Sequence, residues 1–407
     1  MNVYLCGSSA LACYRAGCDP TTKDDIPAEA LRLKDAASYK NDLDGINLKG
    51  LGLGEVDKDT PLEVLVPRAG RRSSVDGIKP HVWSSPIAMG GLCRLGRRLY
   101  VSSPEFLFLQ MATSLDLVPL IAFGMELCGH YRRNVRDPLD GSLGTQYQLP
   151  SLTTAHDLRA FVESMGAVRG VRRARAALRY VLDDSASPME TSIYLLLCLP
   201  RRLGGYGLAQ PTLNPIIQLS KEGRRFTLRR SFSPDLYWHA AKLDLEYDSD
   251  EFHDASTRAG ESMRRKALER MGVEVIGLTY QEVMSTSLFH ATALRIARKL
   301  GKKVRPENEG NFAEARERLR EEVLYRSERT HEHAKREKTV TGMRHLRDED
   351  VLYEDQATWS EPDDGSAGIG WDDDCWYEFG DPSQEYEVCE IGGQLVYHQQ
   401  IDGPASR

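Results

Sequence analysis

Lys242-Leu243-Asp244-Leu245-Glu246-Tyr247-Asp248 is the stretch that decides the fold of this chain. Successive side chains of a β-strand point to opposite faces, so the lysine and the three acids share one face, while the leucines and the tyrosine share the other. Three carboxylates on one face repel one another unless solvent or a cation relieves them. The pattern predicts a strand with one apolar side for a core and one acidic side suited to chemistry.

Two further acids accompany this strand. Asp235 stands eleven positions before Glu246, at the head of the strand candidate Leu236-Tyr237-Trp238. Glu190 lies in the first turn of a helix that opens Ser187-Pro188-Met189-Glu190, with a serine cap followed by proline. Acids on two adjoining strands and a supporting helix can converge on one magnesium ion, which takes oxygen ligands. Such an ion polarises a phosphodiester and supplies hydroxide.

The order of elements over residues 187–280 is helix–strand–strand–strand–helix–strand, which indicates a compact α/β domain. Its second helix is expected at 255–271, where Gly272 would end it. Ser103-Pro104-Glu105-Phe106 is typical of the start of a further helix, and apolar and polar patterning predicts others at 117–131, 152–162, 170–182, 281–300 and 311–338, with further strands at 62–66, 79–83 and 98–101.

The motifs in this region resemble a PD-(D/E)xK nuclease-like domain, and within that group the very-short-patch-repair-like branch. The resemblance is carried by Ser-Pro-x-Glu on the helix, Ser233-Pro234-Asp235-Leu236-Tyr237-Trp238, Leu245-Glu246-Tyr247-Asp248, His253, an arginine-bearing helix and Gly272-Val273-Glu274-Val275-Ile276. It covers about residues 185–285. The Ser8-Ser9-Ala10-Leu11 opening and the arginine-rich helix 170–178 also resemble AbiEi-like abortive-infection and transcriptional-regulator proteins, over about residues 1–300.

The resemblance implies a three-layer, restriction-endonuclease-like α/β domain within an α+β chain. Asp235 and Glu246 would be ligands of Mg²⁺ or Mn²⁺, and Glu190 the helix-borne acid of the same metal site. His253 would act as general base or hold a phosphate. Asp248 counts as a fifth catalytic candidate. The alternative for these strand acids is a solvated polar face, and for Glu190 an ordinary acid favoured by the helix dipole. Asp244 is interpreted as a bystander.

Two departures from the family pattern stand out. Ser249 replaces the usual glycine, and Asp248 stands two residues after Glu246, where many nucleases have lysine. A positive charge would then come from Lys242, Arg264 or Arg265. The arginines Arg172, Arg173, Arg175, Arg224, Arg225, Arg264 and Arg265 are candidates for contacting nucleic-acid backbone, and their alternative is surface solubilisation.

Charge is divided unequally along the chain. The formal net charge is −7, yet residues 348–407 contain 17 acidic residues and Arg407 as the one basic residue, so this tail carries −16 and residues 1–347 carry +9. A basic body suggests contact with polyanions. The tail, with three of the five tryptophans, is expected to be a disordered solvating or partner-binding segment. A sharper hypothesis is that it mimics nucleic acid and masks the body.

Five regions are predicted: a winged-helix-like or mixed region at 1–102, a helical region at 103–184, the nuclease-like domain at 185–300, a charged helix at 301–347 and the acidic tail at 348–407. The eight cysteines include no Cys-x-x-Cys pair, which favours a reduced, cytoplasmic protein without structural zinc. No apolar run approaches the roughly 18 residues of a membrane span, so no membrane partner is expected.

Three classes of function remain open at this point. The first is a DNA-binding protein with a Mg²⁺-dependent endonuclease-like domain that hydrolyses phosphodiesters in defence or repair. The second is a catalytically inactive DNA-binding regulator or antitoxin that retains the nuclease fold. The third is a protein-interaction scaffold that acts through its acidic, aromatic tail.

Overall fold

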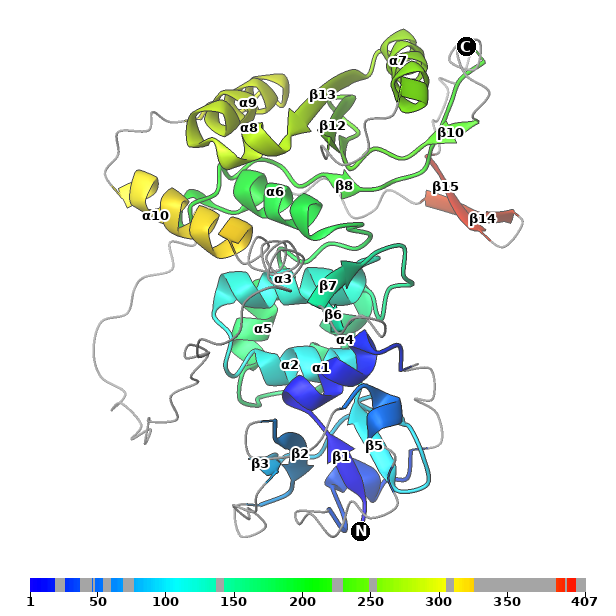
Figure 1. Cartoon of the computed structure of the whole chain (residues 1–407), viewed down its shortest axis with the longest axis vertical. Helices are drawn as coiled ribbons and strands as arrows, with labels where there is room; N and C mark the ends of the chain where they lie inside the picture. The colour runs from blue at the N-terminus through cyan, green and yellow to red at the C-terminus, as the bar shows by residue number, and fades with distance from the viewer. Residues whose placement is uncertain are drawn as a thin grey trace, which may run out of the picture. The chain divides into compact units, whose positions relative to one another are not determined.

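Two units make up the computed structural model, residues 1–343 and 344–407 (Figure 1). The boundary predicted at 347 lies close to this division, and those at 102, 184 and 300 fall inside the first unit, where one hydrophobic cluster contains residues from Val3 to Leu324. The structure describes residues 1–18, 26–36, 46, 48–53, 60–68, 77–136, 143–221, 230–248, 255–304, 311–325, 386–391 and 394–399.

The first sheet is mixed and has the strand order β3-β2-β1-β5-β4. Its central strand β1 runs parallel to β5 and antiparallel to β2. The strands are β1 (Val3–Leu5), β2 (Leu62–Val66), β3 (Ile78–Val82), β4 (Leu92–Arg94) and β5 (Leu99–Ser102). The described residues of 1–102 add one α-helix, α1 (Gly7–Arg15), and the 3₁₀ turns η1 (Ala30–Arg32) and η3 (Lys49–Leu51). This is the mixed alternative of the sequence prediction.

Four helices follow the first sheet within residues 103–184. They are α2 (Pro104–Met111), α3 (Leu117–Cys128), α4 (Ala155–Ser164) and α5 (Val171–Leu178). Ser103 caps α2 by accepting from the backbone N–H of Phe106, with Pro104 at the first helical position. A hairpin of β6 (Arg132–Arg136) and β7 (Leu143–Gln146), which the sequence patterns did not predict, lies between α3 and α4.

The second sheet contains the acidic strand of the opening analysis. Its order is β13-β12-β11-β8, with β12 antiparallel to β11 and parallel to β13. The strands are β8 (Thr212–Leu213), β11 (Leu236–Trp238), β12 (Leu243–Asp248) and β13 (Glu274–Thr279), and α7 (Ala255–Arg270) connects the two parallel strands. A separate two-stranded ladder pairs β9 (Ile217–Gln218) with β10 (Ser231–Phe232).

Apolar side chains cover both faces of this sheet. Leu243 and Leu245 of β12 belong to the main cluster, together with residues of α6 (Pro188–Cys198), α8 (Tyr280–Met284) and α9 (Thr286–Lys299). Tyr237 of β11, on the other face, packs in a smaller cluster with Ala267 and Leu268 of α7. Apolar packing is therefore present on both faces of the sheet, and the leucines of β12 share one face as predicted.

Two predicted helices differ in extent from the observed ones. The helix expected at 281–300 is divided at Ser285, whose extended backbone ends α8 and whose side chain caps α9 by accepting from Leu288 N–H. The helix expected at 311–338 is described as α10 (Asn311–Arg320) and a π turn, η8 (Glu321–Tyr325); residues 326–338 lie outside the described part. A 3₁₀ turn, η5 (Arg201–Leu203), follows α6.

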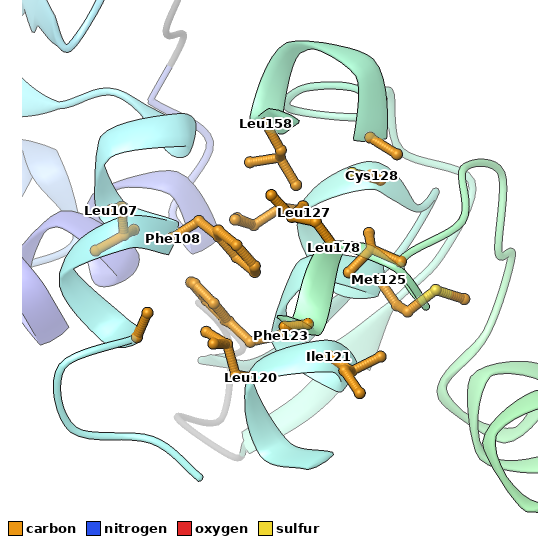
Figure 2. Packing of buried hydrophobic residues seen from close by; sticks show 14 of the residues in the cluster. Leu107, Phe108, Leu120, Ile121, Phe123, Met125, Leu127, Cys128, Leu158 and Leu178 are labelled. Atoms are coloured by element: carbon orange, nitrogen blue, oxygen red, sulfur yellow. The ribbon is translucent and has the colours of Figure 1, made fainter. Parts of the chain in front are cut away.

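The helical region supplies a dense part of the main core (Figure 2). Phe108 of α2 is fully buried, as are Leu120 and Ile121 of α3. Gly124 lets α2 and α3 approach, because a Cβ atom at this position would lie 2.9 Å from the Phe108 ring. Burial of this apolar surface is the main favourable term in the stability of the unit.

Only two segments of the acidic tail are described, and they form an antiparallel hairpin of β14 (Tyr386–Ile391) and β15 (Gln394–Gln399). The expectation of a disordered tail is therefore not met in these two segments, and the rest of 348–407 lies outside the described residues.

Two general expectations concern thiols and membrane spans. Cys6, Cys13, Cys18, Cys93, Cys128 and Cys198, the cysteines that the structure describes, are free thiols. Within the same described residues, no helix has both the length and the apolar character to cross a membrane.

Replacement of Phe108 by alanine tests the core. We expect the free energy of unfolding to fall by about 3–5 kcal/mol, because the ring leaves a cavity among well-packed side chains. Urea unfolding followed by circular dichroism measures the change. Met89→Ala is the control, since Met89 is 73 % exposed and its loss should change stability by less than about 0.5 kcal/mol. Equal effects of the two substitutions would contradict the assigned core.

Candidate functional site: an acidic cluster at the end of the second sheet

The register of β11 and β12 places Asp235 beside Glu246. Leu236 pairs with Leu245 and Tyr237 with Asp244, so Asp235, one residue before β11, comes opposite Glu246. Asp244 and Glu246 lie on the same face of β12 because they are two residues apart. The sequence prediction that these acids approach one another is met by strand pairing. We call Glu190, Asp235, Asp244 and Glu246 the acidic cluster.

Asp235 is held by the neighbouring strand. Its Oδ2 accepts a hydrogen bond from the backbone N–H of Tyr247 at 2.7 Å. Burial raises the pKa of Asp235 well above its usual value, and the negative charges of Glu190 and then Glu246 raise it further. Asp235 is therefore close enough to both Glu190 and Glu246 for their charges to act on it.

Glu190 reaches the cluster from the first turn of α6. The Ser187 side chain caps this helix and accepts from the backbone N–H of Glu190 at 3.1 Å. Glu190 is 6 % exposed, and its Oε2 accepts from Ala186 N–H at 2.9 Å and from Asn214 Nδ2 at 2.7 Å. Burial is the main cause that raises the pKa of Glu190. These contacts position the carboxylate, and the bond from Ala186 N–H is one that an acid in the first turn of a helix commonly accepts, so the alternative of an ordinary first-turn acid fits them as well.

Asn214 connects α6 to β11. Besides donating to Glu190, it donates its backbone N–H to the carbonyl oxygen of Asp235 at 3.1 Å. Its backbone has a φ of +46°, a left-handed conformation that asparagine tolerates better than most residues. The sequence analysis missed Asn214, because no spacing pattern relates a residue outside the strands to two acids from different elements.

Arg264 of α7 is the cation nearest to the strand acids. Its Nη2 donates to Glu246 Oε1, lies 4.0 Å from Asp244 Oδ2 and donates to the carbonyl oxygen of Ser233 at 3.2 Å. The Arg264 side chain is 28 % exposed, whereas that of Glu246 is 15 % exposed. The arginine thus joins the sheet to α7 through a partly buried ion pair.

Asp244 is the least solvated member of the cluster. It is 0 % exposed, its carboxylate oxygens accept no hydrogen bond from a described donor group, and its partner is the neighbouring carboxyl of Glu246, with which it shares a hydrogen bond. Burial raises the pKa of Asp244 to about 6. Burial, followed by the charge of Asp244, raises the pKa of Glu246 to about 8. The sequence analysis set Asp244 aside, although its period-two spacing from Glu246 was a signal that both belong to one site.

The other predicted site residues have different surroundings. Asp248 is exposed at the end of β12, close to Gly277 of β13: a Cβ atom on this glycine would lie 2.9 Å from Asp248 Oδ2 and 3.9 Å from Arg265 Nη2. Asp248 and Arg265 therefore share one edge of the sheet. His253, Arg224 and Arg225 lie outside the described residues.

The arginines of α5 belong to another part of the unit, because α5 packs on α3 and α4. Arg173 donates to the carbonyl oxygen of Leu115 at 2.8 Å, and Arg175 pairs with Glu163 at 2.7 Å. Arg172 is exposed. Of these three arginines, Arg173 and Arg175 already have protein partners for their guanidinium groups, whereas Arg172 is exposed.

The donor atoms of the acidic cluster are of a type that hard divalent cations prefer, but their geometry is not that of a metal site. Among the described residues, no group of three or more His, Cys, Asp or Glu side chains is arranged to hold a metal ion. The donors are carboxylate oxygens, which Mg²⁺ and Mn²⁺ prefer. Asp244 adds a buried carboxyl that is hydrogen-bonded with the carboxyl of Glu246.

Stability of the metal-free protein should depend on the protonation of Glu246. The pKa of Glu246 is about 8 in the folded protein, above the ordinary value of 4.5. Protonation of Glu246 therefore makes its full contribution to stability below about pH 4.5, and this contribution is lost as the pH rises through 8. Between pH 5 and 8.5 we expect the free energy of unfolding to fall by about 1–4 kcal/mol more in wild type than in Glu246→Gln. Urea unfolding in a chelator at both pH values measures the difference.

Glu274→Gln is the matched control for this pH experiment. Arg295 and Lys299 lower the pKa of Glu274 on the neighbouring strand, so its ion pairs persist throughout the tested range. The Glu274 variant should therefore keep the wild-type pH dependence. A wild-type curve parallel to that of Glu246→Gln would contradict the raised pKa of Glu246.

Comparison with known proteins adds no assignment to this geometry. No family model matches the chain, and no curated protein or solved structure matches it. Inference about function therefore begins from the side chains of the acidic cluster and from the fold that assembles them.

Proposed function

We propose that this chain binds DNA and that its restriction-endonuclease-like domain, at about residues 185–300, hydrolyses phosphodiesters with Mg²⁺ or Mn²⁺, in defence or repair. The observation that carries the proposal is the approach of three acids from three elements: Glu190 from α6, Asp235 before β11 and Glu246 on β12. These acids are the ones that the resemblance to PD-(D/E)xK proteins assigns to metal binding.

The order of elements supports the same proposal. Leaving aside η5 and the separate β9–β10 ladder, the order along the chain is a helix, three strands paired antiparallel, a crossover helix and a parallel strand, that is α6, β8, β11, β12, α7 and β13. This is the order expected for the nuclease-like domain. The sheet lies between α7 on one face and α6, α8 and α9 on the other, and this layering presents the strand ends with their acids at one edge.

In the proposed reaction, Asp235 and Glu246 hold the cation and Glu190 adds negative charge behind them. A bound divalent cation would polarise the phosphodiester and lower the pKa of the attacking water. The Tyr247 N–H keeps Asp235 oriented, and Asn214 keeps Glu190 oriented. His253 is proposed as the general base, and Asp248 at the exposed end of β12 as a further contact for substrate or water.

DNA backbone contacts are proposed for exposed arginines. In and beside α5, Arg169, Arg172 and Arg179 are exposed arginines whose side chains have no described partner; Arg169 precedes the helix, Arg172 lies in its first turn and Arg179 is its C-cap. Their positive charge would be available for phosphate contacts, which supply most of the non-specific affinity for DNA. Arg265, and Arg224 and Arg225 from outside the described residues, would serve the same role near the acidic cluster.

A second candidate function is a catalytically inactive DNA-binding regulator or antitoxin that retains the same fold. Two observations favour it. Arg264 already occupies Glu246 Oε1, and the residue two positions after Glu246 is Asp248 rather than lysine. The two functions differ in whether the acidic cluster accepts a divalent cation and supports hydrolysis.

Nicking of supercoiled DNA in the presence of Mg²⁺ or Mn²⁺ separates the two functions. We expect wild type to nick, and Glu246→Gln or Asp235→Asn to lower the rate by at least about 100-fold, because each removes a charged metal ligand. Glu163→Gln, which changes a surface acid paired with Arg175, should retain the wild-type rate. Equal nicking by all four proteins would indicate a contaminant, and no nicking by wild type would leave the regulator as the better proposal.

The DNA-binding part of the proposal has its own test. Arg172→Gln should weaken DNA affinity and reduce the slope of log affinity against log salt concentration by about 1, the value expected for one lost phosphate contact. Fluorescence anisotropy with a short duplex measures both quantities. Arg175→Gln removes the same charge from the same helix, but Arg175 is paired with Glu163, so its salt slope should change less. Equal changes would contradict the assignment of the exposed side of α5.

A further inference from the structure

Two thiols meet where α1 ends. The helix finishes in a Schellman motif: Cys18 N–H donates to the carbonyl oxygen of Cys13 at 2.9 Å, and Gly17 N–H donates to that of Tyr14 at 3.2 Å. Gly17 has a φ of +87°, the left-handed conformation that this motif requires and that glycine adopts without strain. The motif brings the side chains of its first and last residues into contact, and here both residues are cysteines.

The backbone hydrogen bond also limits the separation of the two residues. A disulfide needs Cα atoms about 4.4–6.8 Å apart. With a hydrogen bond of 2.9 Å, the connecting atoms Cα–C=O···N–Cα span about 6.8 Å at most, even when they are fully straight. The two thiols are also hydrogen-bonded to each other. Cys13 and Cys18 are therefore placed for a direct bond between their sulfur atoms.

The two thiols differ in access and in acidity. Cys13 is 0 % exposed, whereas Cys18 is partly exposed. The Cys13 thiol donates its hydrogen bond to the Cys18 sulfur, which lowers the pKa of Cys18 and, together with burial, raises the pKa of Cys13. Oxidants react with accessible sulfur atoms that have thiolate character. Cys18 is therefore the thiol that an oxidant reaches first, and Cys13 lies beside it as the second thiol.

The other cysteines that the structure describes are less suited to this chemistry. Cys6, Cys93, Cys128 and Cys198 are all buried. Burial raises the pKa of Cys6, Cys128 and Cys198, which disfavours their thiolates. Partial exposure and a thiol neighbour thus occur together at Cys18.

We propose that Cys13 and Cys18 form a reversible oxidation site whose substrate is a hydroperoxide. The Cys18 thiolate attacks one peroxide oxygen and breaks the O–O bond, which leaves Cys18 as a sulfenic acid and releases the other oxygen as hydroxide or alkoxide. The Cys13 sulfur then attacks the Cys18 sulfur. The S–S bond forms, the S–O bond breaks, and the hydroxyl group leaves with the Cys13 proton as water. The peroxide takes up the two electrons that the thiols lose, and a thiol reductant returns them.

Trypsin gives a direct readout, because Arg15 separates the two cysteines and cleavage yields peptides 1–15 and 16–23. Full-length protein is treated with hydrogen peroxide, its remaining thiols are alkylated, and the monomer is isolated on a non-reducing gel before digestion. We expect mass spectrometry to detect the two peptides joined, two hydrogen atoms lighter than their sum. Treatment with dithiothreitol before alkylation should abolish this species.

Cys6→Ala is the matched control, because Cys6 lies in the same tryptic peptide as Cys13. This variant should keep the linked peptides. Cys13→Ala should lose them and accumulate Cys18 sulfenic acid, which dimedone captures as a stable adduct. Cys18→Ser should lose both the linked peptides and the dimedone adduct on peptide 16–23.

Three results would overturn the proposal. Loss of the link in Cys6→Ala would assign it to Cys6 instead of Cys13. Unmodified thiols at both positions after peroxide treatment would show that the site does not react. Oxidation of Cys18 to a sulfinic acid without any link in wild type would show that Cys13 does not attack it. Circular dichroism checks that each variant is folded, and Cys18→Ser, at a partly exposed position, provides the comparison if Cys13→Ala unfolds.

Discussion

The pairing register of β12 is the constraint on which this domain depends. β12 lies between β11 and β13, and its odd-numbered residues enter the main core while its even-numbered residues form the acidic side. A slip by one residue would turn Leu243 and Leu245 away from the core and insert Asp244 and Glu246 into it. The apolar face therefore determines the register, and the register in turn brings Glu246 opposite Asp235.

Collecting these acids in one place opposes folding. Burial raises the pKa values of Glu190, Asp235, Asp244 and Glu246, which means that the fold disfavours their charged forms. Local contacts offset part of this cost: the Tyr247 N–H binds Asp235, Asn214 binds Glu190 and Arg264 binds Glu246. Apolar burial in the hydrophobic core offsets the remaining free-energy cost of burying these acids. Such conflict between stability and local chemistry is typical of functional sites.

Much of the local structure followed from short-range patterns. Ser187 and Pro188 indicated the start of α6, and the alternation in 242–248 indicated β12 and its acidic face. The division of 280–300 into two helices did not follow, because Ser285 acts as a cap through its extended backbone, which apolar periodicity does not reveal. The β6–β7 hairpin was missed for a similar reason: it depends on pairing between segments rather than on a strong apolar alternation.

The sequence by itself determined the acidic strand, the preceding Asp235, the capped helix with Glu190 and the opposition of charge between body and tail, because these depend on residue type and spacing. Only the tertiary structure decided that Asp244 is fully buried, that Asn214 links Glu190 to β11 and that Arg264 rather than Lys242 contacts Glu246. These relations join elements that are separated in the chain. They arise from strand register and from the packing of α6 and α7, and neither is encoded in the local spacing of the residues involved.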